Sequence, residues 1–288
     1  MTAPLGRLGI WSIELRTGAE DETRETAAQL EALGWPALWI PGLSGTDGLV
    51  AAERLLAATT RTTVATGVLG QWNHTPAELT ATHHDLQQRY GARLLTGIGV
   101  SNADSARKAG QDFPGPVSAM AAYLDQLDQQ TEPIARDERI LGAMGPRMSR
   151  LAADRSRGLH PFLVSPEYTH STRAALGPSP LIAPHQAVVL ETDPARARAA
   201  ARDGIGMFIG FPSYQANLRR LGFTDADLVP GGSDRLIDSV VAWGDLDAVA
   251  ARLGEHHAAG ADHVALHVLT SEGGPSLDQS WRELASLL

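Results

Sequence analysis

The stretch that decides the fold is Thr63-Val64-Ala65-Thr66-Gly67-Val68-Leu69-Gly70. It is apolar and β-branched and carries no charge, as expected of a strand that is buried on both faces. A polar loop, residues 71–76, follows it directly, so the strand leaves the core and opens onto that loop. A second such stretch, residues 93–102, comes after one amphipathic helix. Two buried strands joined by a helix predict a parallel βαβ unit.

Strand and helix patterns alternate along the rest of the chain. Capping residues and Gly or Pro boundaries mark the helices between the strand-like stretches. The eight predicted strands cover residues 7–15, 37–40, 63–70, 93–102, 139–144, 158–164, 181–191 and 263–269. This alternation predicts an α/β fold of the (β/α)8 TIM-barrel type, and a doubly wound open sheet is the alternative.

One segment interrupts the alternation between the last two predicted strands. Residues 205–227 predict helical pieces and turns, and another helix is expected to begin after Gly232-Ser233, so we place an insertion at about residues 205–235. It carries four aromatic residues, Phe208, Phe211, Tyr214 and Phe223. They predict a lid over a substrate or a dimer contact, with local packing as the alternative. Because no repeat or linker interrupts the chain, we expect a single domain over residues 1–288.

Composition and charge argue against several classes of function. The 288 residues are 43% hydrophobic and 20% charged, as in ordinary globular proteins, and the net charge of −9 does not favour nucleic-acid binding. No apolar run approaches the roughly 20 residues that span a bilayer, and Met1 to Gly9 lacks the features of a signal peptide, so we expect a cytoplasmic protein. The chain has no cysteine, and its histidines share no metal-ligand spacing with a carboxylate, so no metal site is predicted.

The working groups of a barrel lie where its strands end at their C-terminal side. Here these ends are glycines and small residues, which suit a flat, largely apolar ligand held by main-chain groups. Gly145-Pro146 opens a helix whose free N–H groups predict a phosphate site, and a plain strand-to-helix turn is the alternative. Trp72, in the loop after Gly70, is the tryptophan that we expect to face a ligand, whereas we assign Trp11 and Trp39 to the core.

Two ionisable residues at the predicted rim are candidates for catalysis. Glu14, near the end of the first strand, is predicted to be a general base or a rim carboxylate in water. His160 lies near the end of the sixth strand and could exchange a proton near neutral pH. A structural histidine bonded to the backbone is the alternative for His160, and the same two interpretations apply to His74.

These features together resemble the bacterial luciferase-like monooxygenase superfamily. The similarity rests on Thr63–Val68 followed by His74-x-Pro76 and on Gly97–Ser101, and it extends over nearly the whole chain. Within the superfamily the chain is most similar to the F420-dependent oxidoreductases. That likeness rests on Gly145-Pro146-Arg147-Met148, Ala152-Ala153-Asp154-Arg155, Gly158-x-His160-Pro161, Gly232-Ser233-Asp234-Arg235-Leu236 and Trp243-Gly244-Asp245.

The resemblance implies a barrel with an insertion, a small organic substrate, a homodimer, and a deazaflavin (coenzyme F420) or FMN lying in the mouth. It also implies a non-proline cis peptide bond at Gly67–Val68, against the ring, and places the strand-1 acid of some members at Glu14. The cofactor contacts that we expect from it fall at Gly67, Val68, Gly70, Val100, Ser101, Asn102, Met144 and Gly145, the last two at the phosphate.

Two positions depart from the family pattern. An acidic group at the end of the second strand is replaced by Pro41-Gly42-Leu43, and an acid after the fourth strand is replaced by Asn102. Both changes remove proton donors, so His160, Glu14 or water would have to protonate a substrate. Three functions stay open: an F420-dependent oxidoreductase that transfers a hydride, an FMN-dependent monooxygenase, and a degenerate paralogue that acts as a binding module. F420 has a long acidic tail, which would prefer basic groups such as Arg147 or Arg107 at the rim.

Overall fold

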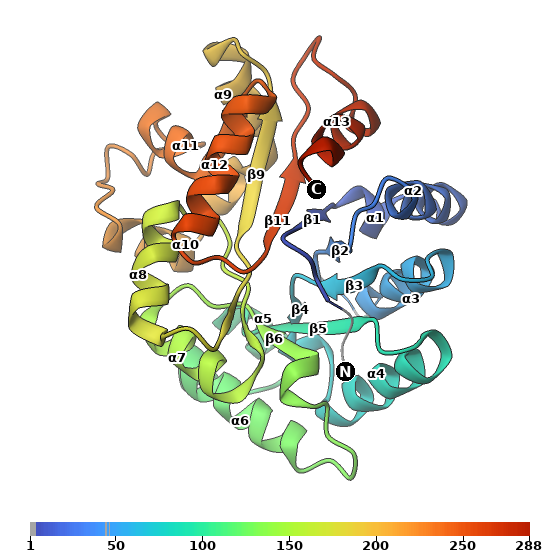
Figure 1. Cartoon of the computed structure of the whole chain (residues 1–288). Helices are drawn as coiled ribbons and strands as arrows, with labels where there is room; N and C mark the ends of the chain where they lie inside the picture. Colours follow the sequence, from blue (N-terminus) through green and yellow to red (C-terminus); the bar gives the residue numbers. More distant parts are fainter. Residues whose placement is uncertain (1–3, 44, 46) are drawn as a thin grey trace.

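The computed structural model describes residues 4–43, 45 and 47–288. They form an α/β fold in which a curled parallel sheet is surrounded by helices (Figure 1). The strands are β1 (Leu8–Trp11), β2 (Ala37–Ile40), β3 (Thr63–Thr66), β4 (Leu69–Gly70), β5 (Leu94–Gly99), β6 (Arg139–Leu141), β7 (Gly158–Leu159), β8 (Leu181–Ile182), β9 (His185–Leu190), β10 (Val241–Gly244) and β11 (Val264–Val268).

Helices connect most of these strands and cover the outer face of the sheet (Figure 1). They are α1 (Glu14–Thr17), α2 (Glu20–Ala32), α3 (Gly48–Ala58), α4 (Pro76–Tyr90), α5 (Ala103–Lys108), α6 (Pro116–Asp128), α7 (Pro146–Arg155), α8 (Pro166–Leu176), α9 (Pro194–Ile209), α10 (Pro212–Arg220), α11 (Asp234–Val240), α12 (Leu246–Ala258) and α13 (Leu277–Leu284). No helix in the part of the chain that the structure describes is both long and apolar enough to cross a membrane.

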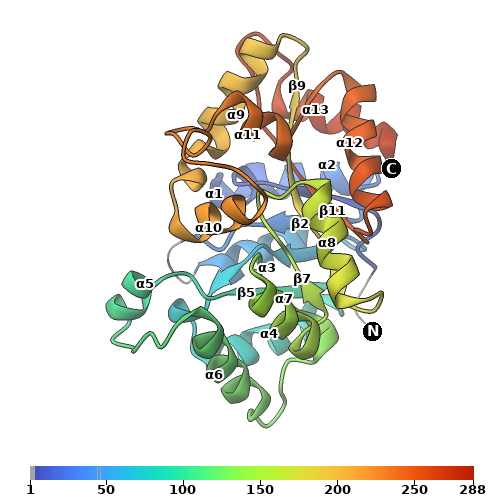
Figure 2. The same ribbon diagram turned by 90° about the vertical axis from the view of Figure 1, so that its left-hand side faces the viewer.

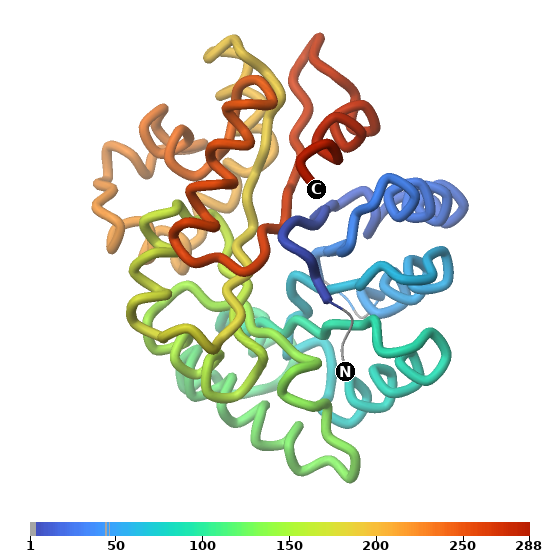
Figure 3. The backbone as a smooth tube through the Cα atoms, in the orientation of Figure 1, coloured from blue at the N-terminus to red at the C-terminus, as the bar shows by residue number. Residues whose placement is uncertain are grey.

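The strands pair along one continuous path. All pairs are parallel, in the order β10-β9-β11-β1-β2-β3-β5-β6-β7-β8, and β4 also pairs with β5. Only Ala183 and Pro184 separate β8 from β9, so the path that leaves β9 through β11 and β1 comes back to it through β7 and β8. Figure 3 shows the chain running round this curled sheet. The arrangement is TIM-barrel-like, as the alternation of patterns predicts.

The strands are shorter and more broken than the sequence predicts. The predicted third strand is divided at Gly67–Val68 into β3 and β4, and the predicted seventh is divided at Ala183-Pro184, where proline has no N–H to donate. The first strand ends at Trp11, four residues before the predicted end at Leu15.

Three further elements differ from expectation. The sequence predicts that Trp243-Gly244-Asp245 caps a helix, and Asp245 is the N-cap of α12, but Trp243 and Gly244 form the end of β10, which pairs with β9. Helix α9 continues to Ile209, so it enters the predicted insertion. The sequence predicts a polar excursion over residues 102–116, and this segment contains the short helix α5. The rotated view in Figure 2 shows that α9, α10 and α11 lie together and that α5 is on the same side of the molecule.

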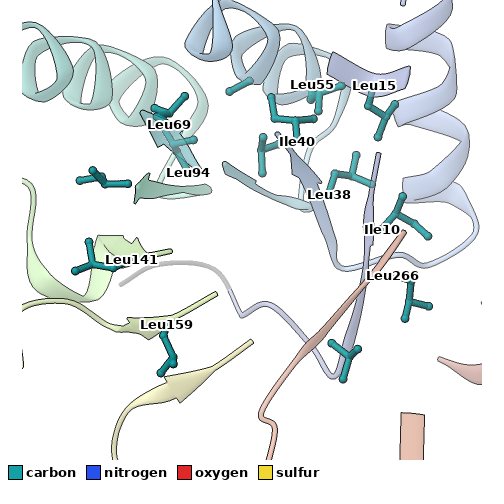
Figure 4. Close-up of a cluster of buried hydrophobic side chains, with 14 of the residues drawn as sticks. Ile10, Leu15, Leu38, Ile40, Leu55, Leu69, Leu94, Leu141, Leu159 and Leu266 are labelled. Atoms are coloured by element: carbon teal, nitrogen blue, oxygen red, sulfur yellow. The ribbon is translucent and has the colours of Figure 1, made fainter. Parts of the chain in front are cut away.

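Side chains alternate between the two faces of the sheet, as the two-residue period of a strand requires. Ile10, Leu38 and Leu94 point outward into a cluster with helix residues such as Leu55 (Figure 4). Each such leucine contributes about 1.5–3 kcal/mol when it is fully buried. This outer shell holds the helices against the sheet and leaves the inner face free for a different set of residues.

The inner face combines very small and very large residues. Ala37, Ala65 and Ala265 leave room for Trp11 and Trp39, and all five are 2% exposed or less. Among these, Trp39 donates its Nε1–H to His263 Nε2 at 2.9 Å. The interior is therefore packed with aromatic rings and imidazoles, and these rings surround the candidate site.

Candidate functional site

The break between β3 and β4 is built around glycines. The Gly67–Val68 peptide bond is cis, as the family resemblance implies. A Cβ atom at Gly42 would lie 2.1 Å from the Val68 carbonyl oxygen, and one at Gly99 would lie 2.5 Å from Val68 Cγ2. A Cβ at Gly97 would lie 1.8 Å from the Thr66 carbonyl oxygen. Side chains at these positions would overlap the bulged backbone, so the glycines make it possible.

Two buried polar atoms converge on Gly67. A Cβ at this position would lie 2.8 Å from Trp11 Nε1 and 2.9 Å from His160 Nε2. Trp11 is 2% exposed and His160 is 3% exposed, and neither nitrogen has a hydrogen-bond partner in the described structure. A donor and a second nitrogen thus lie side by side, both unsatisfied, against the cis peptide. Buried polar atoms without partners are rare in native proteins and call for an explanation.

The tautomer of His160 follows from its backbone contact. Its Nδ1 lies 2.6 Å from the Ala183 carbonyl oxygen. Because a carbonyl oxygen only accepts hydrogen bonds, Nδ1 carries the hydrogen and Nε2 carries the lone pair. Burial lowers the pKa of His160 to about 4, although the bond to Ala183 works against this shift. The imidazole is therefore neutral at pH 7. Stacking on Trp39, with ring centroids 4.4 Å apart, fixes its orientation.

A second pair of imidazoles lies beside Trp11. His185 Nε2 and His267 Nδ1 are 3.1 Å apart, and both rings pack against the indole of Trp11. Burial holds the pKa of His185 well below its ordinary value, and the neighbouring His267 and His160 lower it further. Burial also lowers the pKa of His267 to about 3. The interior is thus polar in its atoms but carries no charge at neutral pH.

Aromatic residues of the insertion meet this interior at Phe162. Phe162 stacks on His185 at 3.7 Å, and the rings of Phe208 and Tyr214 lie 5.0 and 5.9 Å from it. Phe211 joins the same group, because its ring lies 6.0 Å from that of Phe208. Phe223 instead packs under the Arg235 guanidinium at 4.6 Å. Three of the four predicted aromatics therefore gather over one side of the barrel interior.

The predicted contacts after β5 form a local network. Trp72 Nε1 donates to the Val100 carbonyl oxygen at 2.6 Å. Asn102 caps α5, because its Oδ1 accepts from the Ser105 backbone N–H at 2.9 Å. Ser101 has a φ of 56° and its Oγ lies 2.9 Å from Ser105 Oγ. The indole nitrogen of Trp72 is thus already satisfied, whereas the indole nitrogen of Trp11 is not.

Met144 and Gly145 lie at the start of α7, as predicted. Gly145 is the N-cap and no side chain caps the helix, so the first N–H groups of α7 have no side-chain acceptor. Nη2 of Arg220, from α10, lies 3.5 Å from the place of a Cβ at Gly145. The insertion therefore brings a cation to the predicted phosphate position, a feature that the sequence did not reveal because α10 is 75 residues further along the chain.

The remaining predicted residues lie at the periphery. Glu14 is exposed at the first position of α1, where its Oε2 accepts from Ser12 Oγ at 2.7 Å. Gly70 ends β4, and a Cβ there would lie 3.2 Å from Asn73 Nδ2. His74 is 7% exposed, burial lowers its pKa, and its Nε2 has no partner in the described structure. Within the described ranges, no group of three or more acidic or histidine side chains is arranged to hold a metal ion.

Comparison with known proteins agrees with this geometry. The family model described as luciferase-like monooxygenase matches residues 11–133. Residues 11–133 are therefore similar to this family. The matched segment contains Trp11, Gly67, Val68 and the network after β5, and the resemblance seen in the sequence is confirmed. No curated protein matches the chain.

Solved structures share the fold over nearly the whole length. An F420-dependent secondary alcohol dehydrogenase in complex with an F420–acetone adduct has a TM-score of 0.77 at 15% identity, covering 100% of this chain and 98% of that one. A coenzyme F420-dependent tetrahydromethanopterin reductase from Methanopyrus kandleri has a TM-score of 0.75 at 16% identity and 99% coverage of both chains. The oxygenating constituent of 3,6-diketocamphane monooxygenase from Pseudomonas putida, with FMN, has a TM-score of 0.67 at 14% identity, covering 98% and 96%. At these identities the likeness is one of fold.

Proposed function

We propose that the protein is an oxidoreductase that holds coenzyme F420 in the barrel mouth and transfers a hydride between the deazaflavin and a small organic substrate. The observation that carries this proposal is the pair of unpartnered nitrogens, Trp11 Nε1 and His160 Nε2, that meets at Gly67. Together they offer one donor and one acceptor. This combination complements a hydroxyl group of a bound molecule, which both accepts and donates a hydrogen bond. Sites of this kind are where binding and catalysis are found.

The surrounding residues fit such a cofactor. Gly42, Gly97 and Gly99 let backbone approach backbone at the bulge, which provides a main-chain surface for a flat ring. Helix α7 begins after Gly145 without a side-chain cap, so its first backbone N–H groups are placed to donate to a phosphate. When bound, the deazaflavin would supply a ring that accepts or gives a hydride.

The protein's own groups would then orient the substrate and handle its proton. Trp11 Nε1–H would donate to the substrate oxygen, and His160 Nε2 would accept a hydrogen bond from a substrate hydroxyl. Because the pKa of His160 is about 4, the imidazole is a neutral acceptor at pH 7 and would hold a proton only transiently. Glu14 lies exposed on α1, and its side chain contacts Ser12.

An FMN-dependent monooxygenase is the second candidate. One of the similar structures contains FMN, and the start of α7 would accept the single phosphate of FMN equally well. A degenerate barrel that only binds a ligand is the third. All three candidate functions involve a small-molecule ligand. The family resemblance also implies a homodimer, and sedimentation velocity would test this.

Titration of the purified protein with F420 and with FMN, followed by absorbance and fluorescence, tests the proposal. We expect F420 to bind with a Kd well below about 100 µM. We also expect His160→Gln to weaken binding of a substrate alcohol, while the exposed His170→Gln on α8 serves as the matched control. If neither cofactor binds below about 100 µM, the oxidoreductase proposal is wrong and the binding-module alternative stands.

A further inference from the structure

A groove of about 380 Å³ lies in the helix layer between α7, α8 and α10. It shares Met144 and Pro146 with the start of α7, so it continues directly from the position proposed for the phosphate. It lies among the outer helices, whereas Trp11 and His160 are in the barrel interior. A molecule bound at Gly67 and α7 could therefore extend into this groove without disturbing the reacting end.

The groove contains a buried donor that has no partner. Asn217, on α10, is 2% exposed and lines the groove. Its Oδ1 accepts from Arg220 Nη2 at 3.2 Å, which fixes the orientation of the amide, and its Nδ2 then has no acceptor in the described structure. A buried amide N–H without an acceptor costs free energy unless a bound group accepts from it.

The charge of the groove is positive. Arg150 and Arg220 are among its lining residues, and no aspartate or glutamate is. Arg150 donates to the Ala175 carbonyl oxygen at 2.8 Å, and Arg220 has no carboxylate within 4.0 Å among residues 4–43, 45 and 47–288. In a chain of net charge −9, whose arginines are mostly ion-paired, a groove with two arginines and no acid favours an anionic occupant.

We propose that this groove binds the carboxylate-bearing tail of the cofactor beyond its phosphate, with Arg220 and Asn217 as the groups that hold a carboxylate. This inference rests on the proposed function. The Arg220 guanidinium and the Asn217 Nδ2–H group both donate, and a carboxylate offers two acceptor oxygens. The consequence is selectivity: a deazaflavin with an acidic tail binds more tightly than FMN, whose chain ends at one phosphate.

The test compares three deazaflavins by fluorescence titration: the form without phosphate, the phospholactyl form without glutamate, and the form with glutamates. Each is measured on the wild type, on Arg220→Gln and on Arg219→Gln. Arg219 is the matched control, because it is the preceding residue on α10 and pairs with Asp225 at 2.7 Å instead of lining the groove. Asn217→Ala provides a second probe, and thermal melting reports on its folding.

We expect Arg220→Gln to weaken the glutamate-bearing form about tenfold or more, and to leave the phosphate-free form within about twofold. Arg219→Gln should change neither. Asn217→Ala should weaken the glutamate-bearing form too, with an unchanged or higher Tm, because it removes an unsatisfied buried donor.

Three results would overturn the inference while the oxidoreductase proposal survives. These are an equal loss of affinity for the phosphate-free and glutamate-bearing forms in Arg220→Gln, equal behaviour of Arg220→Gln and Arg219→Gln, or FMN binding at least as tight as that of the glutamate-bearing form. If neither a deazaflavin nor FMN binds the wild type, both the inference and the proposed function are wrong.

Discussion

The barrel interior and the groove between α7, α8 and α10 both contain buried polar atoms without partners, but they differ in charge. In the interior these include the indole of Trp11 and the imidazoles of His160 and His185, and burial keeps the imidazoles neutral. In the groove the unpartnered amide of Asn217 lies beside the guanidinium of Arg220. A neutral interior suits an uncharged ring and substrate, whereas a cationic groove suits an anionic tail. One ligand could use both regions, with a different physical basis in each.

The largest expected effect is acid unfolding of the interior. The pKa is about 4 for His160 and about 3 for His263 and His267, because burial disfavours the charged form. Each folded-state pKa is lower than the 6.5 of the unfolded chain, so stability is fully present above about pH 6.5 and is lost as the pH falls toward 4 and 3. His160 alone would account for roughly 3 kcal/mol. Urea unfolding at pH 8, 6, 5 and 4 measures the loss.

Two variants show whether the imidazoles are responsible. His160→Gln should flatten the dependence of unfolding free energy on pH, because it removes one buried group that titrates. The exposed His170→Gln should leave the dependence as it is in the wild type. If both variants retain the wild-type slope between pH 6.5 and 4, the acid sensitivity lies elsewhere in the molecule.

The next effect concerns glycines of the two regions. A Cβ at Gly97 would lie 1.8 Å from the Thr66 carbonyl oxygen, so Gly97→Ala should destabilise the interior by about 2–3 kcal/mol. A Cβ at Gly145, beside the groove, would lie at an ordinary 3.5 Å from Arg220 Nη2, and its φ of −86° suits alanine. Gly145→Ala should therefore change stability by less than about 1 kcal/mol. Denaturant melts of both variants measure this contrast, and equal losses would contradict it.

The sequence predicted more of the interior than of the groove. The alternation of strands and helices, the curled parallel sheet and the cis bond at Gly67–Val68 were predicted, because they follow from periodicity and from a family pattern in contiguous residues. The break at Ala183-Pro184 and the strand ending at Gly244 were not, because pairing partners decide them.

The positions of some predicted site residues followed from local signals. Gly145 was named because a glycine before a helix is a local signal, Met144 was named from the family resemblance, and the structure places both at the start of α7. Trp72 was favoured over Trp11 as a ligand-facing residue, yet only the nitrogen of Trp11 is without a partner. Asn217 and Arg220 were missed. These two residues matter because α10 folds back towards Gly145. The periodicity of the sequence does not predict a contact between residues so far apart in the chain.

A smaller effect separates recognition of the ring from recognition of the tail. Trp11→Phe removes the Nε1–H group but keeps an aromatic ring among His185 and His267. We expect affinity for all three deazaflavins, including the phosphate-free form, to fall about five- to tenfold, because one buried hydrogen bond is lost. The same titrations used for Arg220→Gln measure it. A loss confined to the tailed forms would mean that Trp11 does not face the ring.

The smallest effect is expected at Arg107, a basic residue that the sequence suggested for the tail. Its Nη2 lies 2.7 Å from Asp104 Oδ1, and both side chains are more than 70% exposed, so water screens the charge and the carboxylate opposes it. Arg107→Gln should shift the Tm by no more than about 2 °C and leave the affinity for the glutamate-bearing form within about twofold. Titration beside Arg220→Gln decides between the two arginines. Should Arg107→Gln be the variant that weakens binding, the tail would run along α5, and the groove would lose the role that its charge suggests.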